Sequence, residues 1–76
     1  MAKNKVEIGE TLREIRKRNK VSANDVSIVA KGIYGLNISH KTIERYERGE
    51  VYPSVEYLQF FARHFRYSID FICGVL

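Results

Sequence analysis

This 76-residue sequence predicts an all-α fold of five short helices. Apolar residues recur every three or four positions along much of the chain, which is the period of an amphipathic helix. Serine or glycine stands at most of the places where these helices would begin or end. No segment alternates apolar and polar residues as a half-buried strand does. The length predicts one domain, residues 1–76, with a core over about 6–74.

The first helix is expected over about Val6–Asn19. Ile8, Leu12 and Ile15 fall at helical spacing and would form its buried face. The glutamates of this segment come early, and a run of arginine and lysine comes late. This order favours a helix, because it places each charge near the end of the helix dipole that attracts it.

The second helix is expected to begin after Ser22, a natural N-cap. Asp25 would occupy the third helical position, where a carboxylate can complete a capping box. Either Gly32 or Gly35 would end the helix. The segment 32–37 is therefore expected to be a loop or an irregular extension of the helix.

The third helix is expected over about Ser39–Arg48, with Ser39 as its N-cap and Gly49 as its stop. Ile43 and Tyr46 lie three residues apart on its inner side. The other side carries three hydrogen-bond donors: His40, Lys41 and Arg45. A short helix with donors on one side is suited to the major groove of DNA.

The fourth helix is expected to start at Pro53–Ser54. Its apolar stripe consists of Leu58, Phe61, Ala62 and Phe65. Ser68 would cap a short fifth helix over Ile69–Cys73, and Gly74 would end it.

The net charge of +4 is concentrated in the first two thirds of the chain. Residues 1–49 hold eleven Lys and Arg against six Asp and Glu, and residues 50–76 hold two against three. A basic half suits a polyanion, either nucleic acid or an acidic membrane surface, although a solvated charged face is the alternative. No segment combines a basic face with a wide aromatic one, so membrane binding is the less favoured reading.

Other classes of function find no support in the sequence. Cys73 is the only cysteine, which excludes an internal disulfide and fits a reduced, cytoplasmic setting. No apolar stretch follows Met1–Lys5, so we expect no signal peptide and no membrane span. His40, His64 and Cys73 are too scattered to predict a metal site. No motif predicts an enzyme, a cofactor or a small-molecule substrate.

An ordered set of short matches extends from about residue 7 to residue 74. It comprises Ile8-Gly9-Glu10, Leu12-Arg13, Arg16, Ser22, Val26, Ile38-Ser39, Ile43, Glu47-Arg48-Gly49, Pro53-Ser54, Leu58, Ala62, Phe65, Ser68-Ile69-Asp70 and Ile72. In this set the chain resembles the Cro/C1-type, or xenobiotic-response-element, helix-turn-helix domains of phage repressors. The resemblance implies a five-helix lambda-repressor-like DNA-binding domain. It also implies a homodimer that reads an inverted repeat in double-stranded DNA with the third helix.

The resemblance also implies roles for individual residues. The positions that match base contacts are Ser39, His40, Lys41 and Arg45. The expected phosphate contacts are Ser22, Asn24, Arg48 and Tyr52. Arg16 and Glu47 match a pair that forms an internal salt bridge between the first helix and the end of the third, and the sequence leaves open whether this pair is buried or exposed.

The chain departs from the family pattern in three places. Ser27 follows Val26 where a small residue, commonly alanine, is usual. Ala23 stands where the family often has a phosphate-binding glutamine, so that contact is missing or is replaced by Asn24. The connection between the second and third helices is about six residues longer than usual. The extra residues would form either a longer second helix or a loop near the DNA backbone.

A second aromatic stripe on the fourth helix predicts a dimer interface. Tyr57 and Phe60 exceed what the core stripe needs, and Phe71 of the fifth helix is expected to join them as an apolar anchor of the interface. Surplus aromatic residues in one region are typical of partner surfaces. The alternative is that Tyr57 covers the inserted segment and that Phe60 is partly buried.

The combined pattern predicts a sequence-specific DNA-binding transcriptional regulator, a repressor of phage or bacterial type. One alternative is a DNA-binding antitoxin, in which the aromatic stripe would cap a toxin. Another is a protein-interaction module that kept the fold and lost DNA binding. The missing glutamine and the longer connection favour the module slightly, whereas the cations of the third helix argue against it.

Overall fold

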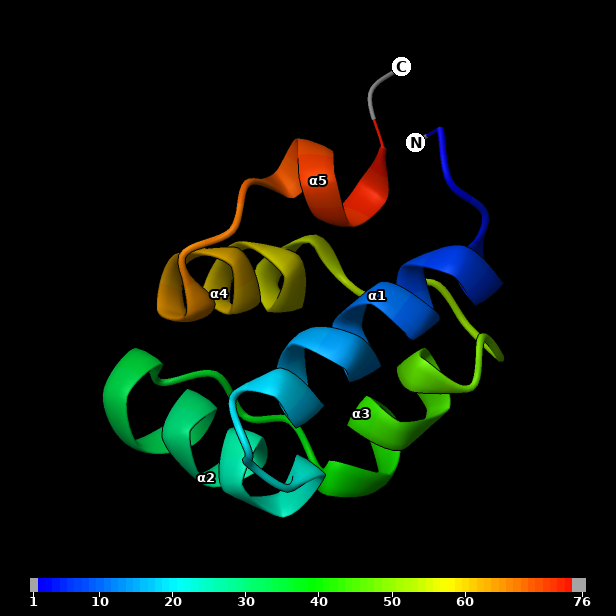
Figure 1. Cartoon of the computed structure of the whole chain (residues 1–76). Helices are drawn as coiled ribbons and strands as arrows, with labels where there is room; N and C mark the ends of the chain where they lie inside the picture. Colours follow the sequence, from blue (N-terminus) through cyan, green and yellow to red (C-terminus); the bar gives the residue numbers. More distant parts are fainter. Residues whose placement is uncertain (1, 75–76) are drawn as a thin grey trace.

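A computed structural model describes residues 2–74 of the chain, and this part contains five helices (Figure 1). They are α1 (Lys5–Arg18), α2 (Ala23–Tyr34), α3 (His40–Glu47), α4 (Val55–Phe65) and α5 (Ile69–Cys73). No strand occurs among these residues, so the all-α prediction is confirmed. The molecule measures 32 × 22 × 22 Å along its principal axes.

Every helix begins with a side chain that accepts a hydrogen bond from the backbone of its first turn. The five N-caps are Asn4, Ser22, Ser39, Ser54 and Ser68. The four serines were predicted as caps or starts, and Asn4 was not. The sequence does contain the pattern for this cap, because Glu7 follows Asn4 three residues later and completes a capping box.

The capping box of α2 is also reciprocal. Ser22 accepts a hydrogen bond from the backbone N–H of Asp25 at 3.0 Å, and the Asp25 carboxylate accepts one from the backbone N–H of Ser22 at 2.9 Å. The bond from the Ser22 backbone is the main cause of the lowered pKa of Asp25, with a further contribution from the Ser22 side chain. The structure therefore starts α2 where the sequence predicted.

Residues 32–34 continue α2 as a regular helix. The helix ends at Gly35, whose φ of 68° lies in the left-handed region that glycine adopts without strain. The backbone N–H of Leu36 then donates to the carbonyl of Ala30. Of the two endings that the sequence allowed, Gly35 is therefore correct and Gly32 is wrong, and residues 32–34, half of the segment 32–37, belong to α2.

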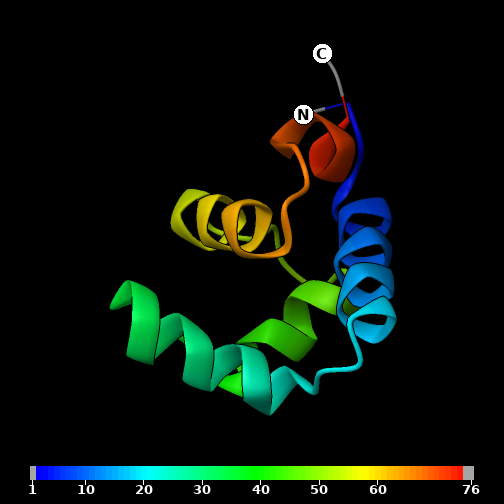
Figure 2. The same ribbon diagram turned by 60° about the vertical axis from the view of Figure 1, so that its left-hand side comes forward.

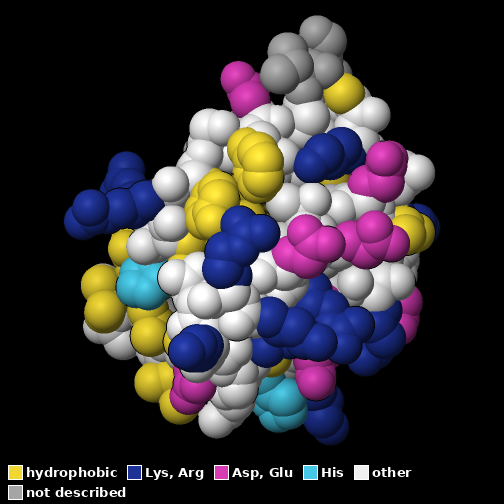
Figure 3. Space-filling view, in the orientation of Figure 1, with side chains coloured by type: hydrophobic (Ala, Val, Ile, Leu, Met, Phe, Trp, Pro, Cys, Tyr) yellow, Lys and Arg dark blue, Asp and Glu magenta, His cyan; other side chains and the backbone are white. Residues whose placement is uncertain are grey.

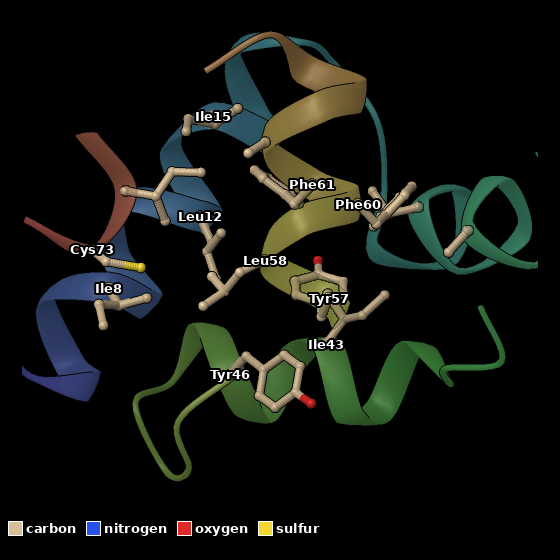
Figure 4. Close-up of a cluster of buried hydrophobic side chains, with 14 of the residues drawn as sticks. Ile8, Leu12, Ile15, Ile43, Tyr46, Tyr57, Leu58, Phe60, Phe61 and Cys73 are labelled. Carbon is tan, nitrogen blue, oxygen red and sulfur yellow. The ribbon is translucent and has the colours of Figure 1, made fainter. Parts of the chain in front are cut away.

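One hydrophobic core joins the helices (Figure 4). Its largest fully buried side chains are Ile8, Leu12, Ile15, Val26, Ile43, Tyr57, Phe61 and Ile72. The start of the chain also packs against α5, where the backbone N–H of Lys3 donates to the carbonyl of Cys73 at 2.9 Å. Phe65, which was predicted for the α4 core stripe, is only half-buried at the edge of this core.

The prediction that Tyr57 and Phe60 anchor a dimer is wrong for these two residues. Tyr57 is 0% exposed and Phe60 is 5% exposed within a single chain. Figure 4 shows Tyr57 between α4 and α3, and Phe60 on the side of α4 that faces α2. The longer α2 explains the difference, because it brings Tyr34 into edge-to-face contact with the Phe60 ring, 4.9 Å between centroids. Tyr57 and Phe60 thus form a second stripe of α4 that faces the core.

His64 is only partly exposed. Its ring stacks on Phe60, and its Nδ1 lies 3.3 Å from the hydroxyl of Tyr34. The partial burial of His64 again depends on the last turn of α2, because Tyr34 belongs to that turn. The C-terminal part of α2 is therefore integrated with α4 through a small aromatic group.

Gly9 permits the close approach of α1 to α3. A Cβ atom at this position would overlap the backbone carbonyl groups of Tyr46 and Glu47. We expect Gly9→Ala to destabilise the fold by about 1–3 kcal/mol, because backbone on both sides cannot move aside as a side chain can. Urea denaturation monitored by circular dichroism would measure the loss.

Gly32 offers the matched control for this substitution. It lies within α2, and a Cβ atom there would meet nothing within 4 Å. Gly32→Ala should therefore stabilise the protein by about 0.5–1 kcal/mol, since alanine loses less backbone entropy in a helix. Equal effects of the two substitutions would contradict the assigned role of Gly9.

Candidate nucleic-acid interface

The helix pair α2 and α3 lies at the end of the molecule opposite α5 in both ribbon views (Figures 1 and 2). The hydroxyl of Ser27 on α2 donates to the backbone carbonyl of Ile38, one residue before the cap of α3. Ile43 and Tyr46 fill the inner side of α3 and are buried. The outer side of α3 is consequently held toward solvent.

The residues predicted to contact bases all lie on this exposed side. Ser39, His40, Lys41 and Arg45 are exposed. Ser39 accepts a hydrogen bond from the backbone N–H of Thr42 at 3.2 Å, so its side chain serves as the cap of α3. The donors available for a ligand are therefore those of the histidine, the lysine and the arginine.

Glu44 shares this exposed side and was missed as a candidate site residue. Its signal was its position, three residues after Lys41 and next to Arg45, which places it on the outer side of a helix. A carboxylate in the major groove can accept a hydrogen bond from the amino group of cytosine. The outer side of α3 thus combines donors with one acceptor.

A second carboxylate, that of Glu50, lies beside the end of α3. One of its oxygens accepts from Nε of Arg45 at 3.4 Å, and the other accepts from Nε of Arg48. The bond from Arg48 is the main cause of the lowered pKa of Glu50, and the same bond raises the pKa of Arg48. Sequence reasoning missed Glu50, because the turn that brings it back toward Arg45 follows a glycine outside the helix.

The predicted phosphate contacts fall into two groups. Ser22 and Asn24 lie at the N-terminal end of α2, where Asn24 is exposed and the side chain of Ser22 serves the capping box. Arg48 and Tyr52 lie at the C-terminal end of α3 and in the following loop, and both are exposed. Ala23 stands where the family often has a phosphate-binding glutamine. It is buried, so its side chain packs in the core.

Lys and Arg side chains gather over α1 and α3 on the face that Figure 3 shows, with Asp and Glu side chains above them over α1.

Among the described residues, no group of three or more His, Cys, Asp or Glu side chains could hold a metal ion. No helix within residues 2–74 is both long enough and apolar enough to cross a membrane.

Arg16 and Glu47 form the ion pair that the resemblance implied. Nε and Nη2 of Arg16 donate to the two carboxylate oxygens of Glu47 at 2.7 and 2.9 Å. Nη1 of Arg16 donates to the backbone carbonyl of Val21 at 2.9 Å. The side chains are 14% and 6% exposed, so the pair is largely buried. Its hydrogen bonds to Glu47 raise the pKa of Arg16. The guanidinium thus joins α1, the loop before α2 and the end of α3.

We expect Glu47→Gln to lower the free energy of unfolding by about 3 kcal/mol, because the substitution leaves the Arg16 cation largely buried without its counter-charge. Urea denaturation would measure the loss. Glu50→Gln is a suitable control, since it removes a carboxylate from exposed ion pairs, and it should have a clearly smaller effect. Similar losses for the two variants would show that the Arg16–Glu47 pair stabilises the fold no more than the exposed ion pairs of Glu50 do.

Comparison with known proteins agrees with this geometry. The family model described as a helix-turn-helix domain matches residues 7–70, which is most of the chain. Neither the comparison with curated proteins nor the comparison with solved structures finds a match. The matched range includes the pair α2 and α3, the Arg16–Glu47 bridge and the exposed side of α3. The chain belongs to the helix-turn-helix family.

Proposed function

We propose that this chain is a sequence-specific DNA-binding transcriptional regulator, a cytoplasmic repressor of phage or bacterial type. The observation that carries the proposal is the outer side of α3. It presents Lys41, Arg45 and Glu44 to solvent on a helix whose inner side is fully packed. Donors and an acceptor held in one orientation suit the base edges of the major groove.

The role of each group in this proposal follows from its chemistry. Arg45 carries a planar fork of donors that matches the O6 and N7 atoms of guanine. Lys41 is a flexible point charge that suits either a base or a phosphate. Asn24, Arg48 and Tyr52 would contact the phosphate backbone and set the register of α3 without reading sequence. His40 adds a donor at the start of the helix.

The proposed dimer would use the exposed side of α5. Phe71 is 53% exposed and stacks on Tyr67, with 5.4 Å between ring centroids, and Ile69 of the same helix is 39% exposed. Of the three residues predicted as dimer anchors, this interface keeps Phe71 and leaves out Tyr57 and Phe60, which are buried. A two-fold dimer would place two α3 helices on half-sites about 34 Å apart in an inverted repeat.

A protein-interaction module that lost DNA binding is the second candidate. The pairing of both Arg45 and Arg48 with Glu50 favours it, because these contacts reduce the positive charge that phosphates would meet. Selection of bound sequences from a random pool of duplex DNA distinguishes the two functions. A regulator should enrich one symmetric sequence and bind heparin at low salt, whereas a module should enrich none and should not bind heparin even at low salt.

Arg45→Ala should weaken binding to the selected operator by about 1–3 kcal/mol, because a bidentate contact to guanine would be lost. Preference should relax at one base pair in each half-site. Lys41→Ala should also weaken binding, and if Lys41 contacts a phosphate the salt slope should fall by about one. Fluorescence anisotropy at several salt concentrations would measure both effects. Unchanged operator affinity in a folded double variant would contradict the proposed reading surface.

Phe71→Glu should shift the protein toward monomer, because a two-fold contact would bring two new carboxylates together. The fold should survive, since the side chain is half exposed. Analytical ultracentrifugation across a range of concentrations would measure the shift, and operator binding should weaken with it. Val55→Glu is the matched control, an exposed apolar residue at the start of α4. Dissociation by Val55→Glu alone would move the interface away from α5.

A further inference from the structure

Glu50 occupies a specific position among the cations at the end of α3. Its backbone N–H donates to the carbonyl of Arg45 at 3.1 Å, and its own carbonyl accepts from Nζ of Lys5 at 3.5 Å. The preceding Gly49 has a φ of 75° and packs directly against Val6. These two contacts fix the backbone of Glu50, so its side chain extends from a defined position in the loop.

The two oxygens of this carboxylate are divided between two arginines. One oxygen faces Nε of Arg45 and the other faces Nε of Arg48. A guanidinium has five N–H donors, one on Nε and four on the terminal nitrogens. Glu50 engages only the Nε donor of each, so the terminal nitrogens, which form the end of the fork, stay available.

We propose that Glu50 is a positioning residue that makes the protein discriminate between operator and non-specific DNA. This inference rests on the proposed DNA-binding function. It adds a residue that affects sequence specificity without contacting a base. Glu50 would hold the Arg45 fork toward a base edge before DNA arrives. It would also offset part of the charge of Arg45 and Arg48, so that the three groups together carry one net positive charge.

Two physical consequences follow for binding. Non-specific affinity comes almost entirely from phosphate neutralisation, and a carboxylate beside the phosphates lowers it. Specific affinity depends on a bidentate contact, and an arginine held in place loses less side-chain freedom when it forms that contact. Glu50 therefore acts in opposite directions on the two kinds of DNA, and its removal should reduce their ratio.

The test compares wild type, Glu50→Gln and Glu10→Gln on the selected operator and on a scrambled duplex of equal length. Glu10 is exposed on α1, and its replacement changes the net charge equally, so it controls for long-range electrostatics. We expect Glu50→Gln to bind the scrambled duplex more tightly and the operator more weakly. The ratio of the two affinities should fall about tenfold, within the range of one bidentate contact. The salt slope on the scrambled duplex should steepen by about one as another arginine reaches a phosphate.

A second readout follows the arginines without DNA. In nitrogen-15 spectra of the free protein, the Nε–H signals of Arg45 and Arg48 should exchange slowly with water. Glu50→Gln should accelerate both, while Arg63, an exposed arginine on α4, should stay the same in both proteins. Thermal unfolding should differ little between the variants, which separates positioning from stability.

The outcomes separate this inference from the proposed function. A wild type that prefers no DNA sequence would overturn DNA reading itself, whatever the arginine signals show. A wild type that prefers its operator, with a Glu50→Gln ratio equal to that of Glu10→Gln, would overturn the role of Glu50 alone. A Glu50→Gln variant that loses affinity equally on both duplexes would overturn it as well.

Discussion

The close contact between α1 and α3 is the constraint on which the rest of the structure depends. At one end of this contact, Gly9 lets the backbone of α1 reach the carbonyl groups of Tyr46 and Glu47. At the other end, the guanidinium of Arg16 binds the carboxylate of Glu47 and the carbonyl of Val21. The contact therefore fixes the C-terminal half of α3 and the entry to α2 together, and it decides which side of α3 reaches solvent.

The small size of the core explains why the aromatic residues of α4 turn inward. A chain of 76 residues that folds around one core buries only about 60% of its extended-chain surface, so every large apolar side chain contributes appreciably to stability. Tyr57 fills the space between α4 and α3, although its hydroxyl finds no hydrogen-bond partner within the described part of the chain. Burial accordingly raises the pKa of Tyr57. Phe60 closes the gap toward α2, where the added helical turn supplies Tyr34.

The proposed reading surface is not uniformly cationic. Lys41 and Arg45 share the outer side of α3 with Glu44, and Glu50 lies between Arg45 and Arg48. In the proposed regulator, such mixing would lower the attraction to the phosphates of any duplex and would leave hydrogen-bond geometry to choose among sequences.

Much of the fold was determined by the sequence through local rules. Serine caps, glycine stops and apolar spacing act within a few residues, so Ser22, Ser39 and Ser68 could be identified as N-caps without knowing what surrounds them. The outer side of α3 was predictable for the same reason. Burial of Tyr57 and Phe60 was decided only by the tertiary structure, because it depends on where α2 ends and what α4 then meets. The carboxylate of Glu50 likewise meets Arg45 and Arg48 only because the chain turns back after α3, and helical spacing does not describe that turn.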